Sequence, residues 1–235
     1  MDDNKLVIQL VDHLRVVLLC YNMYMIISHE DEAYCPPCEN GAHIYSELIC
    51  KFFIPNIETD RNWVTINVGI CYDHSIVFIH SNLNTLKKYA FLENYKDLII
   101  VCSQFSTMKA VQKLGKAIYL PVSIDTKYVK NFRKLQHEKN ACYAGRRGKV
   151  DYQLMKKNHI DMLCDMSHEE LLKRMADYKY VYAVGLTALE AMCLNCNLLP
   201  YDQRFPDITV WKLKDIRTMI PILQQKLDEC DKIET

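Results

Sequence analysis

The sequence is poor in glycine and has no excess of charge of either sign. Only six of its 235 residues are Gly, whereas half are hydrophobic. This composition excludes a disordered or low-complexity chain and allows a sizeable core. The 29 Lys and Arg are balanced by 29 Asp and Glu, so the overall charge does not favour a polyanionic partner such as nucleic acid. The length permits one large domain or two small ones.

Targeting and membrane-spanning segments are also missing. The chain begins Met-Asp-Asp-Asn, which is acidic where a signal peptide is basic. The apolar run at residues 16–27 is interrupted by Asn22 and falls short of the roughly 20 residues that a transmembrane helix needs. Most of the eleven cysteines lie in apolar runs such as residues 98–102, which is typical of reduced, buried thiols rather than of a disulfide framework. We therefore expect a cytoplasmic protein with no transmembrane segment.

The chain does contain an alternation of β-rich and helical segments, which is typical of parallel βαβ units. Several of the β-rich runs are continuously apolar, as expected for strands that are covered on both faces. The predicted strands are residues 15–20, 63–68, 75–80, 97–102 and 116–121, followed by 141–144, 160–164, 180–184 and 197–200. The predicted helices are residues 103–114, 167–179, 187–193 and 211–227, with 42–53 as a further helical candidate.

A domain boundary is predicted near residues 129–140. Residues 131–140 form the most polar stretch of that length, and the strand pattern restarts directly after it. We therefore predict an α/β protein with two Rossmann-like parallel-sheet halves, residues 1–130 and residues 138–235. In the second half, Ser167 and Glu170 have the spacing of a capping box, which predicts the start of a helix at this point.

Five segments stand out when they are read in order: DLIIVCS at 97–103, AIYLPVSID at 117–125, ACYAGR at 141–146, EELLKRMADY at 169–178 and GLTALEAM at 185–192. Together they resemble the retaining glycosyltransferases with the GT-B fold, mainly over residues 97–200. The resemblance implies a minimal GT-B architecture: an N-terminal acceptor-side domain and a C-terminal nucleotide-sugar-binding domain that face a cleft. It also implies an enzyme that moves a sugar from a nucleotide-diphosphate sugar to an acceptor.

The first group of candidate donor-binding residues follows the predicted strand at 141–144. Gly145, Arg146, Arg147 and Lys149 place three cations at a strand's carboxyl end, which is where open α/β sheets bind ligands. Departure of a nucleoside diphosphate builds negative charge, which preorganised cations and N–H donors stabilise. A solvated basic turn is the alternative interpretation.

The second group of candidates begins the predicted helix at 187–193. Gly185, Leu186 and Thr187 would offer free backbone N–H groups to an anion. The resemblance assigns the ribose hydroxyls to Glu190; the alternative is an ordinary turn followed by a surface glutamate. The resemblance also places His80, at the end of the strand at 75–80, beside the reacting sugar. We expect His80 to position the sugar rather than abstract a proton, although a local loop contact would explain it as well.

Two other hypotheses remain open. The family carries a further glutamate eight residues before the position of Glu190, where this chain has Tyr182, so a non-catalytic nucleotide-binding or scaffolding relative is the alternative function. Cys35 and Cys38 have the spacing of a redox motif, but the acidic residues at 29–33 disfavour a reactive thiolate. No metal motif such as Asp-x-Asp is present, and we expect no cofactor besides the sugar donor. The acceptor stays open between glycan, lipid, protein and modified DNA.

Overall fold

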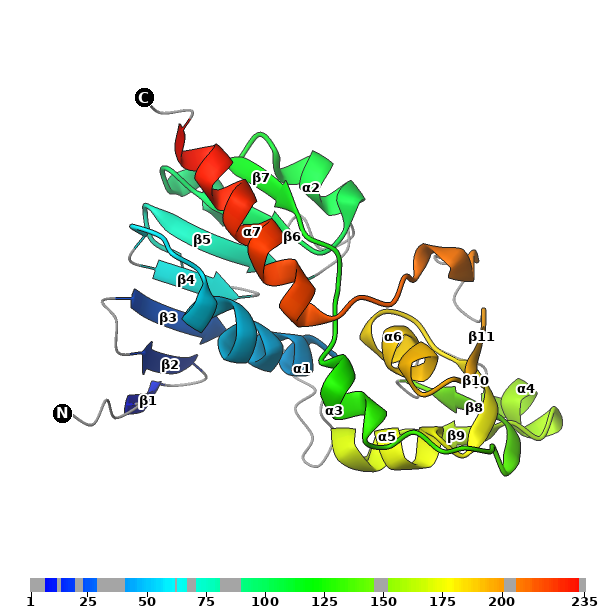
Figure 1. Cartoon of the computed structure of the whole chain (residues 1–235). Coiled ribbons are helices and arrows are strands. Elements are labelled where there is room, and N and C mark those ends of the chain that lie inside the picture. Colours follow the sequence, from blue (N-terminus) through cyan, green and yellow to red (C-terminus); the bar gives the residue numbers. More distant parts are fainter. Residues whose placement is uncertain are drawn as a thin grey trace. The chain divides into compact units, whose positions relative to one another are not determined.

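The computed structural model describes residues 7–11, 14–19, 23–28, 41–61, 63–66, 71–80, 90–145, 152–200 and 206–232. The chain forms two compact units (Figure 1). Unit 1 contains Met1–Glu32, Ile49–Pro121 and Ile220–Thr235, and unit 2 contains Ala33–Leu48 and Val122–Met219. The two units are therefore interleaved in the sequence, which differs from the consecutive halves 1–130 and 138–235 that the sequence predicts.

The C-terminal helix α7, Ile216–Asp231, explains part of this difference. Its later turns belong to unit 1. There the amide of Gln224 donates to the backbone oxygen of Glu58 at 2.9 Å, and the Lys116 ammonium donates to the backbone oxygen of Cys230 at 2.7 Å. Helical periodicity predicts that α7 has an apolar stripe, but it does not say which sheet the stripe covers.

Unit 1 is built on a seven-stranded sheet whose strands follow one another in sequence order. Strands β3 to β7 are parallel, whereas β1, β2 and β3 are antiparallel neighbours. The strand predicted at 15–20 is thus antiparallel, because the two or three residues before and after β2 are too few for a crossover connection. The strands are β1 Val7–Val11, β2 Leu14–Leu19, β3 Met23–Ser28, β4 Trp63–Ile66, β5 Ser75–Ile79, β6 Ile99–Cys102 and β7 Lys116–Tyr119.

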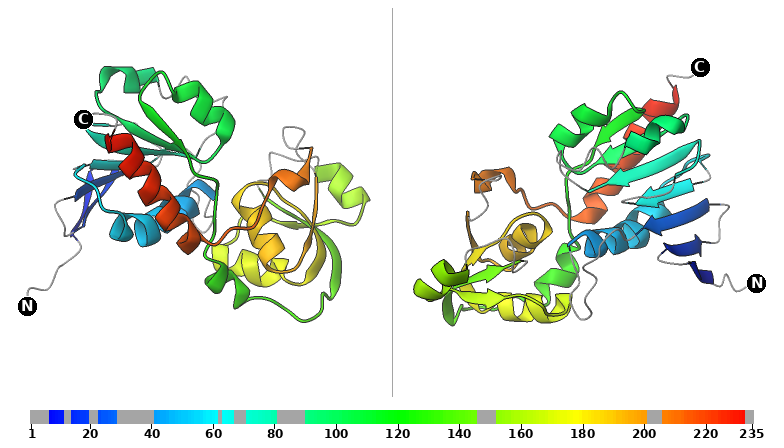
Figure 2. Two further views of the ribbon diagram at one scale, coloured as in Figure 1. Left: turned by 45° about the horizontal axis from the view of Figure 1, so that its top comes forward. Right: turned by 180° about the vertical axis from the view of Figure 1, so that it is seen from behind.

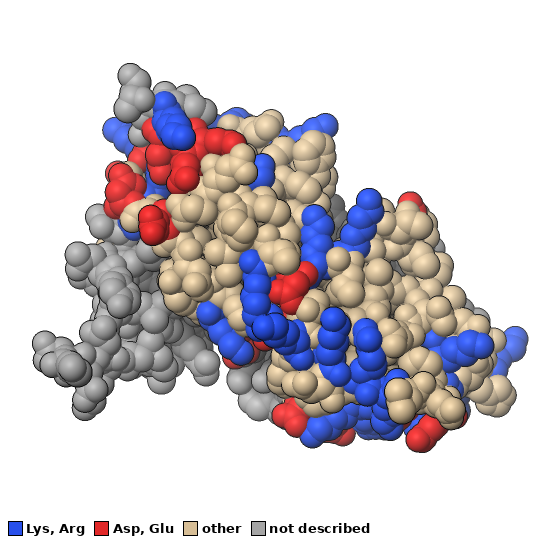
Figure 3. All heavy atoms as spheres, in the orientation of Figure 1, with Lys and Arg blue, Asp and Glu red and all other residues tan. Residues whose placement is uncertain are grey.

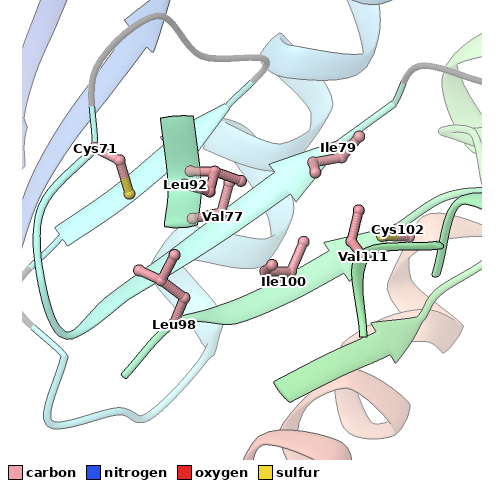
Figure 4. Close-up of a cluster of buried hydrophobic side chains, with 8 residues drawn as sticks. All are labelled: Cys71, Val77, Ile79, Leu92, Leu98, Ile100, Cys102 and Val111. Atoms are coloured by element: carbon pink, nitrogen blue, oxygen red, sulfur yellow. The ribbon is translucent and has the colours of Figure 1, made fainter. Parts of the chain in front are cut away.

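Both faces of the central strands in unit 1 are covered. Alternate residues of β5 and β6 pack with Leu92 and with Val111 of helix α2, Phe105–Val111, in the cluster that Figure 4 shows. The intervening residue Phe78 stacks on Phe53, with ring centroids 6.1 Å apart. Phe53 ends the short helix η1, Ile49–Phe53, which continues α1, Gly41–Leu48. Burial on both sides is the physical reason why these strands read as continuous apolar runs.

Unit 2 contains a four-stranded, fully parallel sheet with the order β11-β10-β8-β9. The chain leaves β8 for β9 on one side and then returns past β8 to β10 on the other side, so the strand order reverses between β8 and β10. Its strands are β8 Lys139–Ala144, β9 Asp161–Leu163, β10 Tyr178–Tyr182 and β11 Asn197–Leu199. Its helices include α3 Thr126–Lys130, α4 Tyr152–Lys157, α5 His168–Met175 and α6 Leu186–Cys193.

The α/β class with a Rossmann-like, largely parallel sheet in each unit is therefore confirmed. Every strand and helix predicted between residues 141 and 200 is observed, with its ends shifted by a few residues. Two further views show α2 and α7 on opposite faces of the sheet in unit 1 (Figure 2). Among the helices that the structure describes, none is long and apolar enough to cross a membrane.

Candidate functional site

The reversal of strand order in unit 2 defines the candidate site. Strands β8 and β10 are parallel neighbours, with Tyr143 paired to Tyr182. Their carboxyl ends therefore lie side by side. Gly145 follows β8 directly, and Gly185 comes three residues after the end of β10. Ligands of open α/β sheets bind outside the carboxyl ends of the strands at such a reversal. The sheet of unit 1 runs in simple sequence order over its seven described strands, so it provides no equivalent position.

The amino terminus of α6 opens at this edge of the sheet. Gly185 has φ +65° and ψ −135°, a conformation that residues with a Cβ rarely adopt. A Cβ added to Gly185 would meet none of the described residues within 4 Å, so they leave the space beside this glycine open.

The first turn of α6 also differs from those of its neighbours in unit 2. The carboxylate of Asp125 caps α3, and the hydroxyl of Ser167 caps α5 by accepting from the backbone N–H of Glu170 at 3.3 Å. No side chain in the described part of the chain caps α6. The first N–H groups of a helix have no acceptor within the helix, so the amino end of α6 is suited to an anion.

Glu190 supplies the second feature of the site. Its side chain is 2% exposed, and Oε1 lies 2.7 Å from Nε2 of His168. The other oxygen, Oε2, is buried and has no hydrogen-bond partner among the residues that the structure describes. The interpretation of Glu190 as a surface residue is therefore wrong. A buried acceptor without a donor is costly, by about 1–3 kcal/mol or more for a charged group, so this oxygen is a candidate acceptor for a donor from outside the described residues.

His168 is the residue that sequence reasoning missed. It is the first residue of α5, and α5 follows the carboxyl end of β9, so the contact with His168 places the Glu190 carboxylate at the same edge of the sheet. The capping pattern at Ser167 located the start of α5. It could not show that α5 and α6 pack against each other, which is what brings His168 to Glu190. A histidine placed directly after a cap residue, at a strand's carboxyl end, was the available signal.

The remaining donor-binding candidates have different environments. A Cβ on Gly145 would lie 2.6 Å from the hydroxyl of the buried Tyr143, so packing alone requires glycine there. The Leu186 side chain is 3% exposed and belongs to the core, which leaves only its backbone for a ligand, whereas Thr187 is half-buried. Arg146, Arg147 and Lys149 lie outside the residues that the structure describes.

His80 follows β5 at the carboxyl edge of the sheet in unit 1. Burial disfavours the charged imidazolium and lowers the pKa of His80 from 6.5 to about 4. The ring is therefore neutral and only weakly basic near neutral pH. A weak base of this kind is better suited to holding a group than to abstracting a proton.

Five of the described cysteines are buried and offer no activated thiol. Burial raises the pKa values of Cys71, Cys102, Cys142, Cys193 and Cys196, those of Cys102 and Cys196 to about 12. Such thiols behave as small buried hydrophobes. The redox candidates Cys35 and Cys38 are not among the described residues. Within the described ranges, no cluster of three His, Cys, Asp or Glu side chains could hold a metal ion.

The charge of unit 2 also favours an anionic ligand. Unit 2, residues 33–48 and 122–219, contains 17 Lys and Arg against 14 Asp and Glu, although the whole chain is neutral. Figure 3 shows basic side chains gathered around α3, whereas carboxylates gather over the C-terminal end of α7. Comparison of the chain with protein-family models, with curated proteins and with solved structures gives no match. A function must therefore be argued from the site itself, because a fold of this class hosts many activities.

Proposed function

We propose that the chain is a nucleotide-sugar-dependent glycosyltransferase of minimal GT-B architecture and retaining mechanism. In this proposal unit 2 binds the nucleoside diphosphate of the donor. One observation carries it: the strand order reverses at the edge where α6 begins without a side-chain cap and where Glu190 has one unpartnered, buried oxygen.

The two parts of a nucleoside diphosphate match the two features of the site. The diphosphate is placed against the amino end of α6 and the cations Arg146, Arg147 and Lys149, which follow Gly145 at the adjacent strand end. These groups stabilise the negative charge that develops as the diphosphate leaves. The ribose hydroxyls donate to Oε2 of Glu190, which supplies the missing hydrogen bond at that buried oxygen.

The other unit is assigned to the acceptor. In this proposal the two units face a cleft, and His80, as a neutral imidazole, positions the transferred sugar. Transfer on the same face of the sugar needs no protein base, which agrees with the low pKa of His80. The acceptor is a glycan, lipid, protein or modified DNA. Buried, reduced cysteines such as Cys142 and Cys196 favour a cytoplasmic location.

A second candidate function is supported by Tyr182. This residue ends β10, three positions before Gly185, where the GT-B family has a glutamate. A tyrosine cannot replace the negative charge of that carboxylate. A protein that binds a nucleotide sugar at the same site without transferring the sugar is therefore the alternative.

Calorimetry on the full-length chain tests the site, with ADP, GDP, CDP and UDP, their 2′-deoxy forms and the free nucleosides as ligands. We expect Arg146→Ala to weaken binding of the preferred diphosphate by about 1.5–3 kcal/mol, the range for a hydrogen bond to a charged group, and to affect the nucleoside much less. Glu190→Gln should weaken ribonucleotides more than deoxynucleotides. A ligand at 100 times its dissociation constant should also add about 2.7 kcal/mol to the unfolding free energy.

The controls are exposed residues of the same unit. Arg174 and Glu170 form a surface ion pair on α5, with 3.7 Å between Nη1 and Oε1, so Arg174→Ala and Glu170→Gln should leave binding unchanged. If Arg146→Ala and Glu190→Gln behave like these controls, the site is wrong. If a nucleotide sugar binds but is neither transferred nor hydrolysed, the non-catalytic alternative takes the place of the transferase.

A further inference from the structure

The Glu190 carboxylate is in hydrogen-bond contact with His168, and nucleotide binding alone does not require this contact. Nε2 of His168 lies 2.7 Å from Oε1 of Glu190, and the two side chains are only 15% and 2% exposed. A carboxylate accepts hydrogen bonds, and the tautomer of His168 with the proton on Nε2 donates one to Oε1 of Glu190. One oxygen of Glu190 is thereby occupied by the protein, and the other is left without a donor among the described residues.

The imidazole is itself held in place. His168 is the first residue of α5, and the Ser167 cap fixes the start of that helix. The ring of Tyr128 on α3 lies against the imidazole, with 6.2 Å between the ring centroids. A glutamate has three rotatable side-chain bonds, and a partner that is anchored in this way removes much of their freedom before a ligand arrives. Such preorganisation increases affinity without adding any contact to the ligand.

We infer that His168 is a positioning residue that determines the preference for ribonucleotides over 2′-deoxyribonucleotides, by fixing the Glu190 carboxylate so that Oε2 is presented to the ribose hydroxyls. This inference rests on the proposed nucleotide site in unit 2. His168 does not touch the ligand in this arrangement and acts through Glu190. The ligand class is a ribonucleoside diphosphate, because the 2′-hydroxyl is the donor that its deoxy form lacks.

Three substitutions at His168 separate the hydrogen bond from simple packing. His168→Gln places an amide N–H near the position of Nε2 and keeps the donor. His168→Asn is polar, but its amide N–H corresponds to Nδ1 and falls short of Glu190. His168→Leu keeps the volume and removes the donor. The Gln and Asn variants are matched in polarity, so they remain informative if the Leu variant fails to fold.

The measured quantity is the ratio of dissociation constants for the 2′-deoxy and ribose forms of whichever of ADP, GDP, CDP and UDP binds the wild type most tightly. We expect a ratio of about 10 or more for the wild type, as one hydrogen bond to a charged group gives. The Gln variant should retain a ratio within about threefold of the wild type. The Asn and Leu variants should fall to a ratio of about 1–3.

His137 provides the matched control. Its ring nitrogens contact the backbone oxygens of Ala176 and Asn195 at 3.1 and 3.2 Å in the same unit. His137→Leu should therefore lower the melting temperature and leave the ratio unchanged. If all three His168 variants keep the wild-type ratio while Glu190→Gln removes it, the inference about His168 is wrong and the nucleotide site stands. If the wild type binds none of the four diphosphates, the inference and the proposed function are both overturned.

Discussion

Among the described residues, the most deeply buried charged side chain is Arg61 in unit 1 and Glu190 in unit 2, each 2% exposed, and the hydrogen bonds of the two differ. In unit 1, Arg61 is 2% exposed and precedes β4, at the amino edge of the sheet. Its Nη1 donates to the backbone oxygen of Asp97 at 2.6 Å, and Nη2 donates to the carboxylates of Asp97 and Asp231 at 3.0 and 3.2 Å. In unit 2, Glu190 is equally buried, but it lies at the carboxyl edge and has one partnered oxygen.

The difference follows from where each charge lies in its sheet. At the amino edge of unit 1, the charge of Arg61 joins the loop before β6 to the last turn of α7, so its partners are supplied by the chain itself. At the carboxyl edge of unit 2, the strand order reverses between β8 and β10, and the described residues leave the space beside Gly185 open. Both side chains keep one buried atom without a partner among the described residues, Nε of Arg61 and Oε2 of Glu190. The position of Glu190 at the carboxyl edge, at a reversal of strand order, is therefore what marks a candidate ligand site in unit 2.

The largest effect is expected when the ion pairs of Arg61 in unit 1 are removed. Arg61→Leu removes the common cation of Asp97 and Asp231, whose side chains are 29% and 40% exposed. Hydrogen bonds to charged groups contribute about 1.5–3 kcal/mol each, and solvent reduces this contribution at the two partly exposed carboxylates. Urea denaturation should show this loss in the free energy of unfolding. Lys113→Leu is the control, because its ammonium lies 3.5 Å from an exposed Glu93 carboxylate and such pairs contribute about 0–1 kcal/mol. A loss below about 1 kcal/mol for Arg61→Leu would contradict the assigned role.

A smaller effect is expected when the pH is lowered, because of His80 in unit 1. The folded protein binds a proton at His80 near pH 4 and the unfolded chain near pH 6.5. The unfolding free energy should therefore be unaffected by His80 above pH 6.5 and should decrease as the pH falls from 6.5 to 4, by up to about 3 kcal/mol. His80→Asn should reduce the change of the unfolding free energy between pH 7 and pH 5. The control, His159→Asn at an exposed position, should leave this change as it is in the wild type. An equal slope in all three proteins would show that the His80 imidazole is not what titrates.

The smallest effects are expected at the two glycines of the site in unit 2. Gly145→Ala pushes a methyl group against the Tyr143 hydroxyl and should cost about 1–3 kcal/mol as overpacking. Tyr143→Phe in the same chain should recover part of this loss, because the hydroxyl is the nearest atom. Gly185→Ala meets no atom and carries only the strain of its positive φ, about 1–2 kcal/mol. The melting temperatures of Gly145→Ala and Gly185→Ala, each with and without Tyr143→Phe, test this difference. If Tyr143→Phe also raised the melting temperature of Gly185→Ala, the explanation would be contradicted.

Much of the fold could be predicted from local patterns. The runs at 75–80 and 97–102 are β-branched and apolar and form β5 and β6, and Ser167 marks the start of α5 to within one residue. Strand β3 was missed because the apolar run at 16–27 spans both β2 and β3, and periodicity does not separate adjacent strands in such a run. Strand β1 was missed as well. Helices α3 and α4 were missed because five or six residues are too few to show a helical period.

The candidate site likewise combines residues that the sequence identifies with contacts that it does not. The glycines after two strands and the glutamate one turn into α6 are visible in the sequence, because a strand end and a helix start are local features. The assignment of α7 to unit 1, the reversal of strand order and the contact between His168 and Glu190 were decided only by the tertiary structure. These depend on which helix packs on which sheet and on which strands pair. Side-chain pattern fixes the face that a segment buries, but not the partner against which it is buried.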